Sequence, residues 1–102
     1  MAQLASGSDK DVLSGALFPL ENDIILRAIS LGARHCYELV NAATLVRVGG
    51  PFESIAEATY AARNWCREHR VNAWEQRTDL HGGAIGSPIR LFTPDAVYMP
   101  LM

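Results

Sequence analysis

The chain has 102 residues, is 49% hydrophobic and carries a formal net charge of −2, which is the composition of one folded globular domain. So small a charge produces no overall field that would attract nucleic acid or an anionic membrane surface. No apolar run approaches the length that spans a membrane. Two cysteines, Cys36 and Cys66, do not make a disulfide framework. We therefore expect a cytoplasmic protein with reduced thiols.

The beginning of the sequence does not have the layout of a secretory signal, because Lys10 is followed by Asp11 and the apolar run 12–20 is interrupted by Gly15 and Pro19. Residues 1–11 are small and polar and carry no helix-capping signal. We predict a disordered segment over 1–11 and a single domain over 12–102.

Three segments before the middle of the chain have strand character. Residues 23–31 suit either a strand, because isoleucines alternate partly, or a helix capped by Asn22 or Asp23 and ended by Gly32; their composition favours the strand. Residues 34–40 alternate cleanly, with His35 on one face and Cys36 on the other. Residues 41–43 suit a turn, so 44–48 would be the second arm of a hairpin, ended by the Gly-Gly-Pro at 49–51.

Residues 54–70 give the clearest helix signal in the chain. Ser54 followed by Glu57 is a capping box, in which the hydroxyl accepts from the N–H of Glu57 and the carboxylate reaches back to the N–H of Ser54. Glutamates occur near the start and basic residues near the end, as the helix dipole favours. One face is formed by residues at spacings of three and four: Ile55, Ala58, Thr59, Ala62, Trp65, Cys66 and His69. We expect Trp65 on this face to be buried against the sheet.

The chain after the helix returns to strands. Residues 71–77 predict one strand, 78–87 a glycine-rich turn region, and 89–92 a short strand that Pro88 fixes at its start. This order of elements predicts an α+β fold, a mostly antiparallel sheet of four to five strands with one long helix packed on one face.

Residues 37–77 resemble small bacterial domains of unknown function in which a hairpin precedes an alanine-rich helix and a strand. The use of arginine for all but one of the basic residues also hints at a GC-rich bacterial genome. Such domains have no established catalytic residues, so the resemblance implies a fold and no site. The matching residues are Val46, Val48, Ala56-Glu57-Ala58, Ala61-Ala62-Arg63 and 71–74.

Two groups of residues have side chains that suit metal binding or catalysis. Cys66 and His69 share one helix face and could bind zinc with His35 or Cys36, but adjacent strand residues point to opposite faces, so the ligand set stays incomplete. His81 precedes two glycines, as in an oxyanion loop, but no G-x-S-x-G sequence accompanies it, and Ser87 lies in a turn. We expect a non-enzymatic protein that has no catalytic residues, cofactor or metal.

Two groups of residues suit contact with a partner molecule. The apolar residues after Asp95 need cover from the protein's own core or from a second chain. We predict an interaction or regulatory module that self-associates as a homodimer, and the predicted interface residues are Val97, Tyr98, Met99, Leu101 and Met102. The alternative is nucleic-acid binding, in which Trp65 or Trp74 would stack on bases and a cluster of arginines would contact phosphates. These arginines are Arg63, Arg67, Arg70 and Arg77.

Overall fold

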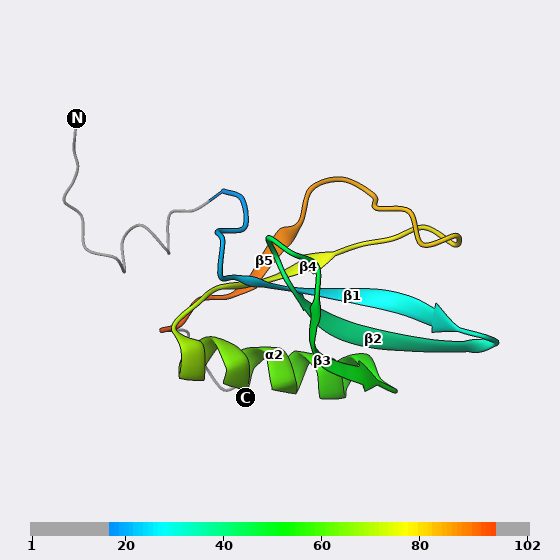
Figure 1. Cartoon of the computed structure of the whole chain (residues 1–102), viewed down its shortest axis with the longest axis horizontal. Coiled ribbons are helices and arrows are strands. Elements are labelled where there is room, and N and C mark those ends of the chain that lie inside the picture. Colours follow the sequence, from blue (N-terminus) through cyan, green and yellow to red (C-terminus); the bar gives the residue numbers. More distant parts are fainter. Residues whose placement is uncertain (1–16, 96–102) are drawn as a thin grey trace.

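The computed structural model describes residues 17–95, whose strands form one sheet that a single helix covers on one face (Figure 1). The sheet has five strands in the order β3-β2-β1-β4-β5; β1 runs parallel to β4, and the other neighbouring pairs are antiparallel. The predicted α+β class is confirmed. No helix in this part of the chain is long and apolar enough to cross a lipid bilayer. The elements are β1 (Ile24–Leu31), β2 (Arg34–Asn41), β3 (Arg47–Phe52), α2 (Ile55–His69), β4 (Ala73–Gln76) and β5 (Ile89–Phe92).

The predicted disordered segment, 1–11, lies outside the described residues. Of the apolar run 12–20, the structure describes only residues 17–20.

The segment 23–31, which suited either a strand or a helix, forms the central strand β1. Its first half is buried on both faces: Ile24 and Leu26 pack beneath α2, and Ile25 packs on the opposite side with Val40 and Trp74. A strand covered on both faces has a continuous apolar run instead of a strict alternation. This is why the sequence pattern alone was ambiguous.

The helix α2 begins and ends close to its predicted bounds. Ser54 is the N-cap, and its Oγ accepts from the N–H of Glu57 at 3.1 Å. The carboxylate of Glu57 accepts from the N–H of Glu53 at 3.2 Å, one residue before the Ser54 N–H that the capping box predicts. At the other end Arg70 adopts the left-handed conformation, with φ 57°, and its N–H donates to the carbonyl of Cys66.

The buried residues of α2 are small, which lets the helix lie close to the sheet. They are Ala58, Ala62 and Cys66. Trp65, which we expected to be buried against the sheet, is only partly buried, and its ring stacks on that of His69 with centroids 4.0 Å apart. The fully buried indole is that of Trp74, which is 2% exposed. Helical periodicity placed Trp65 on the correct face of the helix, but only part of that apolar face is in contact with the sheet.

The predicted second arm of the hairpin, 44–48, is displaced along the sequence. Asn41 Oδ1 accepts from the N–H groups of Ala43 and Thr44 at 2.8 and 2.9 Å, which keeps the chain in a turn, and Leu45 has a positive φ of 62°. The strand then runs through the Gly-Gly-Pro sequence at 49–51, which was predicted to end it. Because β3 is an edge strand, the absent N–H of Pro51 need not remove a ladder hydrogen bond.

A buried carboxylate joins the start of β1 to β4. Asp23, which is 1% exposed, accepts through Oδ1 from the N–H of Asn72 and through Oδ2 from the N–H of Leu20 and from Nε1 of Trp74, each at 2.9 Å. Its carbonyl also accepts from the N–H of Ala42 at 2.8 Å. Asp23 thus fixes three separate segments of the chain at one end of the sheet.

Replacing this carboxylate tests its contribution to stability. Asp23→Ala leaves the buried donors of Asn72 and Trp74 without their acceptor, which should lower the free energy of unfolding by about 3 kcal/mol or more. Urea denaturation followed by tryptophan fluorescence measures this change. Asn22→Ala, at the exposed neighbouring position, is the control and should change the free energy by less than about 0.5 kcal/mol. Equal effects of the two substitutions would show that Asp23 has no special role.

Candidate functional site

The face of the sheet opposite α2, called here the open face, carries polar side chains beyond the buried end of the sheet. Odd-numbered residues of β1 lie on this face, and their partners in β2 are even-numbered, so Arg27 lies opposite Glu38 and Ile29 opposite Cys36. In β4, Gln76 lies beside Arg27. The open face therefore changes along β1 from an apolar cluster around Ile25 to a polar region around Arg27.

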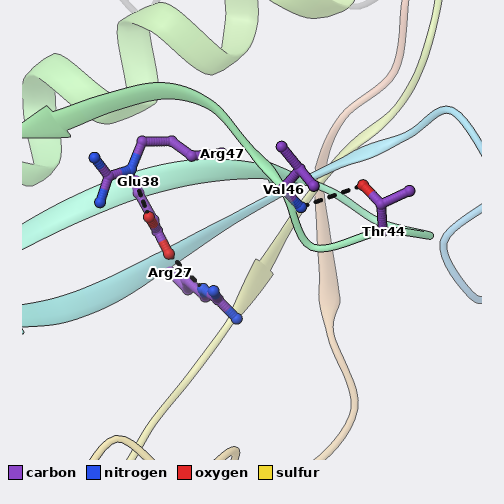
Figure 2. Close-up of polar contacts among 5 residues, drawn as sticks. All are labelled: Arg27, Glu38, Thr44, Val46 and Arg47. Carbon is purple, nitrogen blue, oxygen red and sulfur yellow. Dashed lines mark hydrogen bonds and ion pairs between the residues drawn. The ribbon is translucent and has the colours of Figure 1, made fainter.

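Two arginines from the neighbouring strands bracket the carboxylate of Glu38. Nε of Arg27 in β1 donates to Oε2 of Glu38, and Nε of Arg47 in β3 donates to Oε1, each at 2.8 Å. Figure 2 shows the carboxylate between the two side chains, with the terminal nitrogens of the two guanidinium groups pointing away from each other. The side chain of Glu38 is only 6% exposed, while those of Arg27 and Arg47 are 33% and 44% exposed.

This arrangement fixes the ionisation of Glu38. Burial disfavours the charged form, but the hydrogen bonds and positive charges of Arg47 and Arg27 outweigh it, and together they hold the pKa of Glu38 below its ordinary value of 4.5. Two guanidinium groups around one carboxylate leave a local charge of +1. Each arginine donates from Nε to Glu38, which leaves its outward Nη atoms suited to an acidic group from outside.

A groove lies next to this cluster, between the second half of β1 and the chain that links β4 to β5. We call residues 77–88 the arm; in Figure 1 they rise from the side of the sheet opposite α2. One wall of the groove is formed by β1 and the other by the arm. The residues that line it include Arg27, Ala28, Ile29, Ser30, Leu80 and Ala84.

The arm holds its shape through its own polar contacts. Oδ1 of Asp79 accepts from the N–H groups of His81 and Gly83, each at 2.8 Å, and the N–H of Asp79 donates to the carbonyl of Gly83 at 2.8 Å. At the base of the arm, Nε2 of Gln76 donates to the carbonyls of Arg77 and Gly86, each at 3.1 Å. The glycine-rich segment predicted as a turn region is thus a braced loop.

The structure separates the residues considered as metal ligands. Cys66 is buried on the side of α2 that faces the sheet, Cys36 is buried on the open face, and both thiols are free. His35 and His69 are exposed on different elements. Within residues 17–95, no group of three or more His, Cys, Asp or Glu side chains is placed to hold a metal ion.

The residues considered for catalysis do not converge either. Burial and then the negative charge of Asp23 raise the pKa of Cys66 to about 12, so this thiol is a poor nucleophile at neutral pH. His81 and Ser87 are exposed in the arm. Oxyanion-loop chemistry would need a nucleophile beside the glycines, and the N–H of Gly83 is instead bound by Asp79.

The four arginines predicted to contact nucleic acid do not form one patch. Arg67 and Arg70 line a shallow hollow at the end of α2, where Arg70 forms an ion pair with Asp95 at 2.9 Å. Arg63 lies over the ring of Tyr60, 5.4 Å from its centroid. Arg77 follows β4, a strand that begins near the end of α2 and runs away from it over about 13 Å. Nucleic-acid binding by this set stays a prediction.

The predicted interface residues Val97, Tyr98, Met99, Leu101 and Met102 lie outside the described residues.

The cluster of Arg27, Glu38 and Arg47 was not predicted from the sequence. The available signal was a glutamate inside an apolar strand, between Cys36 and Val40 on one face, with an arginine in each adjoining strand. A charge in such a position requires a partner. Identifying the two arginines required the register of three strands, which the sequence does not provide.

The lowered pKa of Glu38 predicts how its contribution depends on pH. Since the folded-state pKa lies below the ordinary value of 4.5, the stabilisation is complete above pH 4.5 and is lost as the pH falls through the lower pKa. Glu38→Gln should therefore lower the melting temperature clearly at neutral pH and much less at acid pH, where the carboxyl group of Glu38 is protonated in the folded protein. Glu68→Gln, on the exposed surface of α2, is the control and should have little effect at either pH. A deficit for Glu38→Gln that is constant with pH would contradict the ionic role.

The buried thiol gives a second prediction. Because the pKa of Cys66 is raised to about 12, iodoacetamide at pH 8 should leave Cys66 unmodified in the folded protein and modify it after unfolding in urea. Mass spectrometry of tryptic peptides measures the modification, and the unfolded sample is the control. Labelling of Cys66 in the folded protein at the rate of an exposed cysteine would contradict its burial.

Comparisons of the chain with family models, curated proteins and solved structures find no match, so the resemblance of residues 37–77 to small bacterial domains stays a prediction.

Proposed function

We propose that the chain is a non-enzymatic interaction or regulatory module that associates with a second copy of itself, and that the arm is part of the contact. The observation that carries this proposal is a braced loop that presents large aliphatic side chains to solvent. In the arm, Leu80 is 97% exposed and Ile85 is 49% exposed, and Ile89, the residue of β5 that follows the arm, is 48% exposed. Exposed aliphatic side chains on an ordered loop are typical of contact surfaces.

The rigidity of the arm favours association. The contacts of Asp79 and Gln76 fix its backbone before any partner arrives, so binding orders fewer residues and loses less conformational entropy. Burial of a fully exposed large aliphatic side chain contributes about 1.5–3 kcal/mol, and burial of a half-exposed one contributes about half of that. Leu80, Ile85 and Ile89 together can therefore offset much of the entropy lost when two chains associate.

The two outer edges of the sheet are less suited to this role. The strand β5 has only four residues between Pro88 and Thr93-Pro94, and β3 contains the Gly-Gly-Pro sequence and shifts register twice against β2. Short edges, prolines and bulges are features that discourage pairing between sheets of separate molecules. Contact through the arm is therefore favoured over contact through β3 or β5.

Sedimentation velocity over a range of concentrations tests the proposal. The chain has a mass of 11.2 kDa, and we expect the wild-type protein to approach twice this value as concentration rises. The double substitution Leu80→Asp and Ile85→Asp should shift the protein to the monomer, because each introduced carboxylate would have to lose water in the contact. Circular dichroism should show the same fold for both proteins.

A matched control uses the other exposed aliphatic pair of the described residues. Leu45 and Val46 lie in the loop between β2 and β3 and are also more than half exposed. Leu45→Asp with Val46→Asp should leave the mass unchanged. A wild-type protein that stays monomeric at every concentration contradicts self-association, and an arm variant that still dimerises contradicts the role of the arm.

A further inference from the structure

The central strand β1 has a strand neighbour on its β4 side over only half of its length. It has eight residues, and β2 pairs with all of them, but β4 pairs only with Ile24 to Arg27. After Gln76 the chain leaves the sheet as the arm. The stretch from Ala28 to Leu31 therefore has an open edge on the β4 side, although β1 is the central strand of the sheet.

The open edge has hydrogen-bonding groups that point into the groove. The N–H of Ile24 donates to the carbonyl of Asn72, on the β4 side, and backbone groups alternate in direction along a strand. Ser30 lies an even number of residues after Ile24, so its backbone groups point to the same side. Its N–H and C=O therefore point away from β2 and toward the arm. These two groups are the pattern that an added strand requires.

The groove has the form of a slot beside a strand edge. Ala28 and Ser30 lie on its β1 wall, and Leu80 and Ala84 lie on its arm wall. The arm is anchored at its base by Gln76 and bridged between Thr78 and Ala84, so the second wall is already in place. A preformed slot of this kind favours an extended peptide with small or aliphatic side chains.

We propose that the groove takes segment 96–102 of a second copy of this chain, added to β1 as a strand. The inference rests on the proposed self-association and names the site of contact. In this segment Val97, Met99 and Leu101 occupy every second position. Pro100 lies between the last two, and its nitrogen has no hydrogen to donate. With Pro100 turned away from β1, the N–H groups of Val97, Met99 and Leu101 all turn toward it.

The position of Asp95 makes a second copy the better donor. Phe92 pairs with Ala73, and Ala73 pairs with Ile24, so β5 ends level with the start of β1. Leu31 lies seven residues further along β1 and two strands across from β5, which places it about 25 Å from Phe92. Asp95 lies beyond Phe92 at the end of α2, where it is paired with Arg70.

The reach of the segment follows from these positions. Seven extended residues span at most about 25 Å. Segment 96–102 would be used up in crossing from Asp95 to its own groove, and too little would remain to lie along Ala28 to Leu31. A second copy related by a two-fold axis has no such limit, and each chain would then fill the groove of the other.

Full-length variants test the groove and the segment separately. Ser30→Pro removes the N–H that faces the groove, and Met99→Pro removes the matching N–H of the segment; neither removes a hydrogen bond between β1 and β2. Each should weaken the dimer about tenfold or more, because a backbone hydrogen bond is lost at both copies of a symmetric contact. Ser30→Ala and Met99→Leu keep the N–H groups and should dimerise like the wild type.

Disulfide trapping identifies the occupant independently of folding effects. A chain with Ser30→Cys is mixed with a chain with Met99→Cys and oxidised, and the native thiols do not compete because Cys36 and Cys66 are buried. We expect a mixed dimer linked between positions 30 and 99. In the double variant Ser30→Cys and Met99→Cys, a disulfide within one monomer at low concentration would overturn the assignment to a second copy.

The outcomes distinguish this inference from the proposed function. Loss of the dimer in the arm variant, with full dimerisation in both proline variants and no disulfide between positions 30 and 99, would overturn the groove contact and leave self-association standing. A wild-type monomer at all concentrations would overturn both. Weakening by both proline variants, together with the mixed disulfide, would support strand addition between two copies.

Discussion

The fold depends on one buried carboxylate more than on any other polar group. Asp23 accepts hydrogen bonds from Leu20, Asn72 and Trp74, and its carbonyl accepts from Ala42. These partners belong to the lead into β1, the start of β4 and the turn after β2. The parallel alignment of β1 with β4 depends on this point, because only Arg70, Val71 and Asn72 separate the end of α2 from the start of β4. An acceptor with two oxygens satisfies donors from both segments at once, which an apolar residue of similar size could not do.

The same alignment produces the features on the open face. Because β4 has only four residues, the arm leaves the sheet halfway along β1, and the groove opens beside Ser30. At the point where β4 ends, Arg27 is the last residue of β1 that β4 pairs with, and its guanidinium is held by Glu38. The groove therefore begins directly beyond the arginine cluster, because the short strand β4 ends beside Arg27. A longer β4 would cover the edge of β1 and leave no slot.

The elements whose signals are local could be predicted from the sequence. The helix α2 was located by the cap at Ser54, and β5 by Pro88, because capping and backbone restriction act over a few residues. The bounds of β3 were wrong because the sequence does not show that a strand lies at a sheet edge, where Pro51 is tolerated. Trp65 was expected to be buried against the sheet and is only partly buried, since periodicity gives a direction and not a depth. The sequence signals a charge at Glu38 that needs a partner, but the contacts of Glu38 with Arg27 and Arg47 depend on the register of three strands.

The half-paired central strand also determines how stability is distributed along the molecule. Backbone amides of β1 from Ile24 to Arg27 lie between two strands and over the buried core, so they open to solvent only when most of the domain unfolds. Toward Leu31 the strand has a neighbour on one side only, and the hairpin continues through exposed residues to Arg34. Hydrogen exchange should therefore accelerate along this one strand, from global unfolding at its first residues to local fraying at its last. The chain thus combines a rigid end and a compliant end within eight consecutive residues.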